Sequence, residues 1–499
     1  MSQLISTPET LASAAADVQN IGSTINAARA GAAGQTTGLV AAAEDEVSAA
    51  VANLFGAYGQ QYQATLSQAA TFHTEFTRAL TAAASTYAQA EAANAALVAG
   101  ISNELTAPLR ALLGPAGVTG GASTGPSVLT SLVSSPAGDP LYALIMGGTN
   151  NPQPDPFYVN SVYNSYIKPV FGSAIVQGVF TPEQFWPVTP GLGNLTFGQS
   201  VARGVTLLHN AITSTLGNVN NSAVVFGYSQ SATIATNEIN ALLAAGSTIP
   251  ANQLSFVLIG DPNNPVGGLL ERFPGFYIPF LDVSFNGATP QSPWHTSVYT
   301  YQYDGIADAP QYPLNLVSDL NAFMGYFFVH NQYPLLTATQ VGTAVPLPTN
   351  GGNTDYYMLM TQNLPLLEPI RAIPYAGPPI ADIFQPDLRV LVDLGYGDYG
   401  PGANYANIPT PAGLFDLPNP FTVIPDLALG AVQGPYGAAV EIGVEAGLLS
   451  PSYFPDTYPW VPSINPGLNI SFGQSSTTLL SVLSGAAGNV LHLIPPPNF

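Results

Sequence analysis

The sequence GYSQS at residues 227–231 places a serine where a strand pattern gives way to a helix pattern. Residues 223–227 are apolar, β-branched or aromatic up to the glycine, and residues 231–245 have apolar side chains at helical spacing. A Gly-x-Ser-x-Gly motif in this context is the nucleophile elbow of a serine hydrolase. Ser231 replaces the second glycine, so the pattern is looser, and an ordinary strand–turn–helix also produces it. Ser229 is therefore a candidate nucleophile, provided that the chain also offers a base and an orienting acid.

The base must come from the five histidines. In α/β-hydrolases the triad follows the chain order serine, acid, histidine. Three histidines fail on position, because two precede the serine and one lies in a proline-rich tail: His73, His209 and His492. His295 precedes a predicted strand at 297–304, so it would enter the sheet at the wrong end. We predict that His330, in the segment GYFFVHNQY, is the base.

The orienting acid should follow the strand that lies behind the base. Asp304 ends the predicted strand SVYTYQYD and is the first choice. Asp308 is second, although it could instead brace the loop. Asp261, at the end of LSFVLIGD, is third, and it could instead cap the turn that follows. All three remain open at this point.

An acyl-transfer site also needs donors for an oxyanion, and two backbone amides are candidates. Gln230 follows the serine and begins the helix, where N–H groups have no partner within the helix. The second donor should come from the loop GGTNNP, residues 147–152, after the first predicted strand. We predict the backbone amide of Thr149, with Gly148 as the neighbouring choice and the Thr149 hydroxyl as a possible aid.

Composition excludes several classes of function. Charged residues make up only 7% of the 499 residues, and the formal net charge of −21 argues against binding nucleic acid or anionic lipid. The chain has no cysteine, and it contains no HExxH, P-loop or GxGxxG motif, so the sequence predicts no metal and no cofactor. No apolar run is long enough to predict a transmembrane segment, and the N-terminus lacks the features of a Sec signal peptide. On these grounds alone the protein would be cytoplasmic.

Strand and helix patterns alternate through the middle of the chain. Strands are predicted in four segments, 141–150, 223–227, 254–262 and 297–304, and helices at 198–217 and 231–245. This alternation predicts a mainly parallel sheet covered on both faces. We therefore assign residues 139–400 to an α/β-hydrolase domain, and 401–499 to a Pro- and aromatic-rich C-terminal extension. That extension either packs on the hydrolase core as part of its domain, or forms a flap or a lipid-contacting surface.

The first 95 residues form a separate, Ala-rich block. Thr7-Pro8-Glu9 is typical of a helix N-terminus, and apolar residues then recur at helical spacing. Glycines at 31 and 34 are expected to break this first helix, and a second helical pattern runs from about residue 40 to 95. The block thus predicts a helical hairpin, which a Gly/Ser/Pro-rich linker at 96–138 joins to the rest of the chain.

The helical block resembles the mycobacterial PE domain. Pro8-Glu9 stands at the place that names the family, and Tyr87-Ala88-Gln89-Ala90-Glu91 matches its YxxxD/E secretion signal. The resemblance implies export by a type VII system to the cell wall or cell surface, in place of the cytoplasmic location. It also implies two partners for the hairpin: a helical protein of the PPE family and a secretion chaperone.

Residues 145–397 resemble the PE-PPE domain, a mycobacterial α/β-hydrolase family related to cutinases. The resemblance rests on an ordered set of segments, among them MGGTNNPQP, GYSQSA, IGDPNNPVGGLLERFPG, YQYDGIADAPQYPLN and FQPDLRVLVDLGYG. It implies a serine esterase or lipase acting on acyl esters or lipids, with Ser229, Asp304 and His330 as its triad. Two alternatives stay open: an acyltransferase that builds cell-wall glycolipids through the same acyl-enzyme, and a non-catalytic surface antigen.

Overall fold

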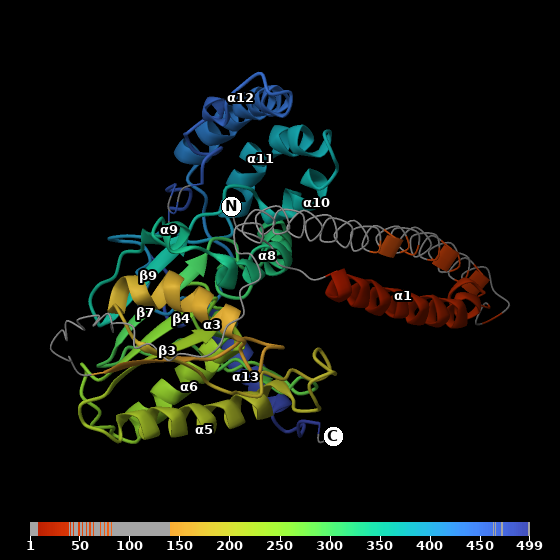
Figure 1. Ribbon diagram of the computed structural model, residues 1–499. Coiled ribbons are helices and arrows are strands. Elements are labelled where there is room, and N and C mark those ends of the chain that lie inside the picture. Colours follow the sequence, from red (N-terminus) through yellow and green to blue (C-terminus); the bar gives the residue numbers. More distant parts are fainter. Residues whose placement is uncertain are drawn as a thin grey trace, which may run out of the picture. The chain divides into compact units, whose positions relative to one another are not determined.

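The computed structural model describes residues 8–38, isolated positions between 40 and 81, and residues 140–497 except 463, 465, 471 and 472. The chain divides into two compact units, Met1–Ser131 and Leu132–Phe499 (Figure 1). Of the first unit, the structure gives one complete helix, α1 (Pro8–Thr37). Most of the expected second helix at 40–95, and the whole expected linker at 96–138, lie outside the described residues.

The prediction that glycines end the first helix is wrong. Helix α1 continues through Gly31 and Gly34 and ends at Thr37, where the Gly38 N–H donates to the Gly34 carbonyl at 3.0 Å. An interior glycine costs only about 1 kcal/mol relative to alanine. The surrounding residues 27–33 are mostly alanine, the best helix former, so the helix tolerates both glycines.

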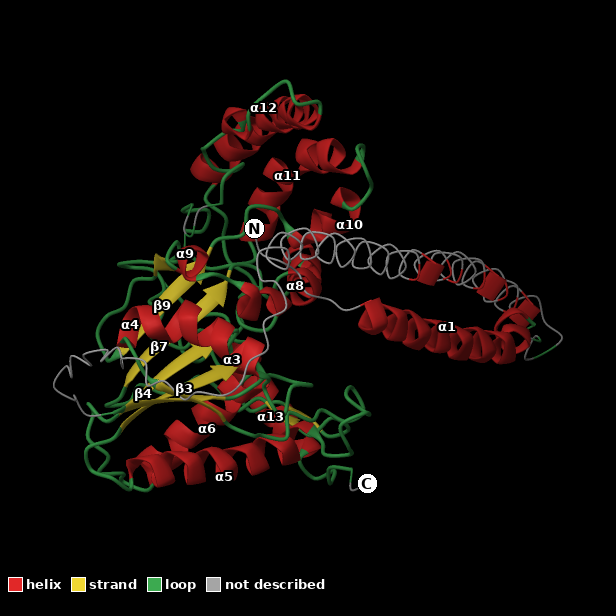
Figure 2. Cartoon of the chain, in the orientation of Figure 1, coloured by secondary structure: helices red, strands yellow, loops and turns green. Residues whose placement is uncertain are grey.

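The second unit is built on a seven-stranded sheet in the order β2-β1-β3-β4-β7-β9-β8 (Figure 2). Only β8, which pairs with β9, is antiparallel. The strands are β1 (Leu141–Ile145), β2 (Ile175–Gly178), β3 (Ser222–Tyr228), β4 (Leu254–Ile259), β7 (His295–Tyr301), β8 (Val345–Pro346) and β9 (Thr354–Leu359). A separate two-stranded ribbon pairs β5 (Tyr277–Ile278) with β6 (Val283–Ser284). The predicted α/β fold with a mainly parallel sheet is confirmed.

Helices cover both faces of the sheet. They are α3 (Pro156–Val162), α4 (Lys168–Phe171), α5 (Phe197–Leu216), α6 (Gln230–Ala244), α7 (Leu269–Arg272), α8 (Leu316–Phe328), α9 (Ala338–Val341), α10 (Glu368–Arg371), α11 (Gly377–Asp393), α12 (Pro420–Glu445) and α13 (Leu479–Leu491). Leu144, Val225 and Phe256 pack with α5 and α6, whereas Val224 and Phe226 pack with α3 and the π-helical turn Tyr163–Ile167 that follows it. Alternate residues of each strand thus enter opposite layers, as the pleat requires.

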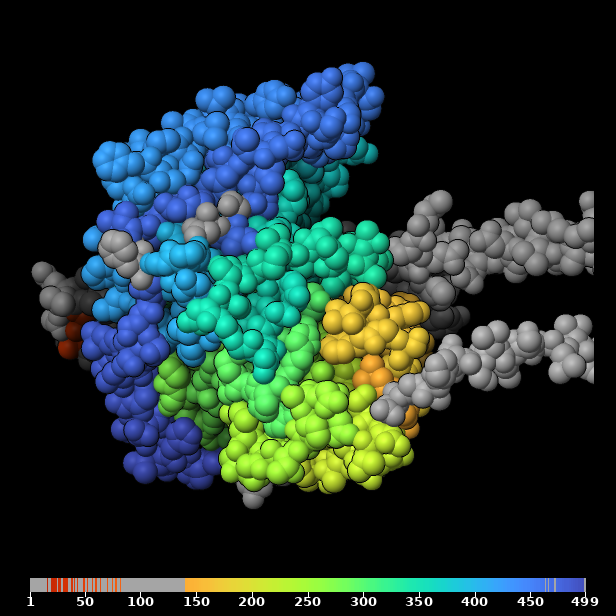
Figure 3. Space-filling view, turned by 90° about the vertical axis from the view of Figure 1, so that its left-hand side faces the viewer, coloured from red at the N-terminus to blue at the C-terminus, as the bar shows by residue number. Residues whose placement is uncertain are grey.

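The C-terminal residues pack on the body of this unit and extend above it as a lobe that includes α12 (Figure 3). The buried Arg272 guanidinium donates to the Thr410 carbonyl and, at 2.7 Å, to the Thr410 hydroxyl. Gln311 donates its side-chain amide to Gln474 Oε1 at 2.6 Å. Residues beyond 400 therefore complete hydrogen bonds of the earlier part of the unit.

Candidate active site

The turn between β3 and α6 has the strained geometry of a nucleophile elbow. Ser229 has φ 55° and ψ −117°, a conformation that non-glycine residues adopt only when their surroundings enforce it. The Ser229 N–H donates to the Ile259 carbonyl at 3.1 Å, which fixes the turn to the neighbouring strand. A Cβ at Gly227 would lie 2.7 Å from the Ser231 carbonyl oxygen, so only glycine lets the strand and the helix pass this closely.

Ser231, which stands where the motif has its second glycine, closes this turn. Its hydroxyl accepts from the Tyr228 N–H at 2.8 Å and donates to the Tyr228 carbonyl at 3.1 Å. The side chain is fully buried, and these two bonds satisfy it. The departure from the motif therefore adds a brace to the elbow.

The structure brings together the three residues predicted as a triad. His330 Nε2 lies 2.9 Å from Ser229 Oγ, and His330 Nδ1 lies 2.8 Å from Asp304 Oδ2. The side chain of Asp304 is 0% exposed and that of His330 is 4% exposed, whereas Ser229 is partly open to solvent. Because a carboxylate only accepts, Asp304 favours the tautomer with hydrogen on Nδ1, which leaves Nε2 free to accept from the serine.

These residues meet because parallel strands end at one edge of the sheet. Ser229 follows β3, and Asp304 follows β7, two strands away. His330 lies over the end of the strand between them, β4: a Cβ on Gly260, the residue after β4, would lie 3.1 Å from the imidazole Cε1. Helix α8 leads from the β7 edge back to this point and ends two residues before the histidine.

Aromatic rings and a second hydroxyl hold the histidine and the acid. The ring centroid of Tyr228 lies 5.4 Å from that of His330, that of Tyr326 lies 5.8 Å away, and Tyr228 Oη donates to the His330 carbonyl at 2.8 Å. Tyr333 Oη donates to Asp304 Oδ2 at 2.8 Å and accepts from the Tyr301 N–H at 2.7 Å. Asp304 Oδ1 also accepts from the Ile306 N–H at 2.9 Å, so the carboxylate is fully oriented.

The backbone amides of Gln230 and Thr149 were predicted as the oxyanion donors, and a side-chain hydrogen bond joins these two residues. The Thr149 hydroxyl donates to Gln230 Oε1 at 3.0 Å, while Gln230 Nε2 donates to the Gln184 carbonyl at 2.9 Å and to Ser200 Oγ at 3.0 Å. Among the described residues, the turns and helix caps provide no acceptor for the N–H of Gln230 or of Thr149. Both remain candidates for binding a ligand oxygen.

Comparisons with known proteins match this architecture. The profile described as "PE family" matches residues 4–94, and the "PE-PPE domain" matches residues 172–397. The PE family protein PE3 of Mycobacterium tuberculosis (strain ATCC 25618 / H37Rv) is 55% identical over 503 residues, which cover 99% of this chain and 100% of PE3. This chain belongs to the PE family. Its second unit carries the PE-PPE domain.

Two further similarities are more distant. Esterase PE16 of the same strain is 43% identical over 443 residues, which cover 88% of this PE-family chain and 77% of PE16. The solved structure of a cutinase-like protein from Cryptococcus sp. is 22% identical and covers 34% of this chain and 79% of its own, with a TM-score of 0.25.

The alternative acids of this PE-family chain have hydrogen-bond partners other than the histidine, whose Nδ1 contacts Asp304. Asp308 Oδ2 accepts from the Tyr303 N–H at 2.7 Å, and burial raises the pKa of Asp308 to about 7. Asp261 accepts from the Asn263 N–H at 2.9 Å and from the Thr289 hydroxyl at 2.8 Å, and burial raises its pKa to about 6. These bonds agree with the alternative structural roles given for the two residues, in which Asp308 braces its loop and Asp261 caps the turn that follows it.

The buried residue Glu183, which the sequence did not point to, braces the loop that carries Thr149 through its backbone. Glu183 is fully buried with φ 47°, and its carbonyl accepts from the Asn150 N–H at 2.9 Å. The Thr181 hydroxyl donates to its Oε1 at 2.6 Å, and burial raises the pKa of Glu183 to about 8. A neutral Glu183 can thus hold the loop without placing a charge beside the site.

The remaining predicted residues belong to the PE region. The backbone of Pro8 and Glu9 forms the first turn of α1, whereas Tyr87 and Glu91 lie outside the described residues. In the described part of the chain, no cluster of three or more His, Cys, Asp or Glu side chains is placed to hold a metal ion. None of the helices searched there is both long and apolar enough to cross a membrane.

Proposed function

We propose that this chain is a serine esterase that hydrolyses acyl esters through an acyl-enzyme on Ser229. The observation that carries the proposal is the continuous contact from Ser229 Oγ through His330 to the fully buried Asp304, at 2.9 and 2.8 Å. This arrangement, on a strained elbow at the carboxyl edge of a parallel sheet, matches what nucleophilic catalysis requires. The name of the relative PE16 as an esterase supports the same reaction class.

In the proposed reaction His330 Nε2 takes the serine proton as Ser229 Oγ attacks the carbonyl carbon of the ester. The amides of Gln230 and Thr149 bind the oxyanion, and losing one such donor costs about 3 kcal/mol of barrier. The imidazolium then protonates the departing alkoxide, which leaves the acyl group on Ser229. A water molecule, deprotonated by the same Nε2, attacks the acyl-enzyme and releases the acid.

The test is hydrolysis of a series of p-nitrophenyl esters by the full chain and three variants. Ser229→Ala and Asp304→Asn should each lower kcat by about 10⁴-fold, since the triad acts as a unit. Asp308→Asn is the matched control, because it removes a buried acid four residues away, and we expect less than about a tenfold loss. Equal losses in the two asparagine variants would overturn the assignment of Asp304.

Reaction with a fluorophosphonate separates hydrolysis from the alternatives. The probe forms a bond from Ser229 Oγ to phosphorus and releases fluoride, so it reports an activated serine without an acyl acceptor. Labelling without ester hydrolysis would favour the acyltransferase, in which a sugar hydroxyl replaces water. Absence of both in the full chain, with Ser229→Ala unchanged, would favour a non-catalytic surface protein.

We also propose that the PE region directs export through a type VII system with a helical PPE-family partner and a secretion chaperone. Membership of the PE family supports this route. The test compares the culture filtrate and cell wall with the cell lysate for the parent chain and for Tyr87→Ala. Retention of the variant inside the cell is expected, and equal export of both chains would contradict the role of the YxxxE motif.

A further inference from the structure

Helix α8, which leads into the candidate active site, exposes large apolar side chains and buries small and polar ones. Its buried residues are small or polar, namely Ser318, Asn321, Ala322 and Gly325. Its outer face carries large apolar side chains: Leu316 is 75% exposed, Leu320 50%, Phe323 59% and Phe327 52%. Surface helices normally turn their apolar stripe inward. A contiguous exposed apolar patch of this kind marks a surface that binds something.

Hydrogen bonds and close packing fix this orientation. Ser318 Oγ donates to the Val392 carbonyl at 2.5 Å, and Asn321 Oδ1 accepts from the Leu366 N–H at 3.0 Å. At Gly325 the helix backbone meets the Tyr303 carbonyl so closely that a Cβ would lie 1.8 Å from its oxygen. Turning the apolar face inward would break these bonds and force Phe side chains against that backbone. The contacts of the buried face therefore keep the large apolar side chains of α8 on the outside of the protein.

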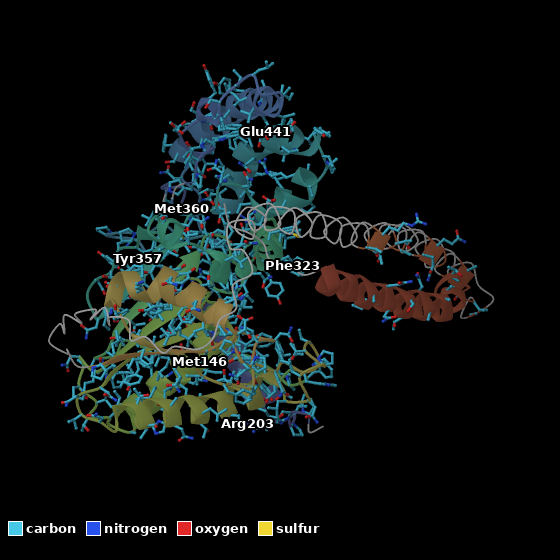
Figure 4. All side chains as sticks on the ribbon, in the orientation of Figure 1. Met146, Arg203, Phe323, Tyr357, Met360 and Glu441 are labelled. Atoms are coloured by element: carbon cyan, nitrogen blue, oxygen red, sulfur yellow. The ribbon has the colours of Figure 1, made fainter. Side chains whose placement is uncertain are left out.

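The apolar face is continuous with the candidate active site. The ring of Phe327 lies 5.2 Å from that of Phe323 and 5.1 Å from that of Tyr326, between centroids. Tyr326 in turn stacks on His330 at 5.8 Å. Figure 4 labels Phe323 on the α8 side of the unit, clear of the strands. Whatever binds this face thus lies next to the residues that contact Ser229.

The charge of the protein determines which kind of surface the apolar face of α8 can bind. Between residues 273 and 370 the sequence contains no lysine or arginine, and Asp319 is the only charged residue of α8. The whole chain carries a formal charge of −21, so both an anionic membrane and a second copy of the chain would be repelled. The apolar face of α8 is therefore suited to binding an uncharged apolar surface.

We infer that α8 docks this protein on uncharged or zwitterionic lipid, with Leu316, Leu320, Phe323 and Phe327 entering the lipid surface. This inference rests on the proposed function, because docking of α8 on an aggregated lipid phase would bring its esters to Ser229. Interfacial helices bind in this way, through a buried apolar face whose area sets the affinity. Helix α8 is short, so its affinity alone should be modest and reversible.

The experiment measures flotation of the full-length chain carrying Ser229→Ala with phosphatidylcholine vesicles. Replacing both Phe323 and Phe327 by serine should weaken partition by at least about tenfold. The matched control replaces Phe421 and Ile424 of α12, which are 90% and 65% exposed, by serine and should leave partition unchanged. Mixed vesicles of phosphatidylcholine and phosphatidylglycerol should bind no better than phosphatidylcholine alone.

Three outcomes would overturn the inference. They are equal partition of the α8 variant and the α12 control, stronger binding to the anionic vesicles, and a change of oligomeric state in the α8 variant with vesicle binding unaltered. Flotation uses the serine-less chain, so it does not depend on catalysis. Lipid binding through α8 without ester hydrolysis by the parent chain would therefore refute the proposed esterase and leave docking intact.

A kinetic readout complements the binding assay. In the chain with an intact serine, the double α8 variant should lower the ratio of rates on an emulsified triacylglycerol and on a soluble p-nitrophenyl ester. An unchanged ratio would show that ester hydrolysis at Ser229 does not use the α8 face, and it would overturn the inference.

Discussion

Helices α6 and α8 adjoin the two members of the Ser229–His330 contact, but they bury opposite kinds of residue. Helix α6 starts after the serine and buries ten of its 15 residues, including Ile234, Ala235 and Ile239. Helix α8 ends before the histidine, buries small and polar residues, and exposes large apolar ones. The comparison teaches that the rigidity of a site and its contact surface can come from different elements.

The largest difference should appear in stability. Ile234 is fully buried and packs tightly against α5, where a Cβ on Gly204 would lie 2.3 Å from its Cδ1. We expect Ile234→Ala to lower the free energy of unfolding by about 2–5 kcal/mol. Phe323→Ala, on the open face of α8, should change it by no more than about 0.5 kcal/mol. Urea denaturation of the full chain measures both, and a similar cost for Phe323→Ala would mean that another part of the protein covers α8.

The buried hydroxyls of the two helices offer a second test. Ser231→Ala leaves the Tyr228 N–H without its acceptor, and Ser318→Ala leaves the Val392 carbonyl without its donor. Each should cost about 1–3 kcal/mol of stability, because a buried polar group becomes unsatisfied. Only Ser231→Ala should also lower kcat on a soluble ester, by roughly tenfold, because it loosens the elbow. Equal effects of the two variants on kcat would argue that Ser231 has only a structural role.

Tyr333→Phe tests the hydroxyl that holds the acid. The variant keeps the ring that packs against His330, but it removes the donor to Asp304 Oδ2. Without this donor, the Asp304 carboxylate is held less firmly toward His330 Nδ1. We expect kcat on a soluble p-nitrophenyl ester to fall about tenfold with KM little changed, because the imidazole is less well aligned to accept the serine proton.

The control for this experiment is Tyr166→Phe. It removes another buried hydroxyl, which donates to the Tyr333 carbonyl at 2.9 Å and does not contact Asp304. Its kcat should stay within about threefold of the parent value. The same loss of kcat in both variants would show that loss of packing or stability, and not loss of the bond to Asp304, lowers the rate.

The smallest effect concerns Asp319, the only charge on α8. Burial raises its pKa from 3.8 to about 6, so ionisation disfavours the folded state, and its contribution to stability declines as pH rises towards and through 6. Neutral Asp319 should also enter lipid more readily, so partition to phosphatidylcholine should be roughly two- to threefold stronger near pH 5 than near pH 7.5. Asp319→Asn should abolish most of this dependence. A parent-like dependence in the variant would place the titrating group elsewhere.

The sequence predicted the elements whose signals are local. Glycine at 227, the serine two residues later and the apolar run before them together mark the elbow. Chain order, together with the place of each histidine relative to the predicted strands and the proline-rich tail, singled out His330. Three candidate acids could not be separated, because their distances from the histidine depend on how β4 and β7 pair. The edge strands β2 and β8 were also missed, since short edge strands have weak patterns. The sequence analysis missed β9 too, although it lies inside the sheet between β7 and β8.

Other features depend on tertiary contacts that no local pattern encodes. The apolar spacing of 316, 320, 323 and 327 indicates a helix face, but periodicity does not say whether that face is covered. Glu183 gives no signal, since its role depends on complete burial. Tyr333 could have been found, because it follows His330 by three residues and so lies on nearly the same side of a helical turn.

The Gln230 side chain joins the segments around the candidate site through uncharged hydrogen bonds. Its oxygen and its nitrogen together bind three segments that are far apart in sequence: the hydroxyl of Thr149, the carbonyl of Gln184 and the hydroxyl of Ser200. None of these groups titrates in the ordinary pH range, and none carries a charge that salt could screen. A clamp of this kind keeps the same geometry in acid, at neutrality and across salt concentrations. It gives a chain with so few charges a site whose alignment tolerates changing surroundings.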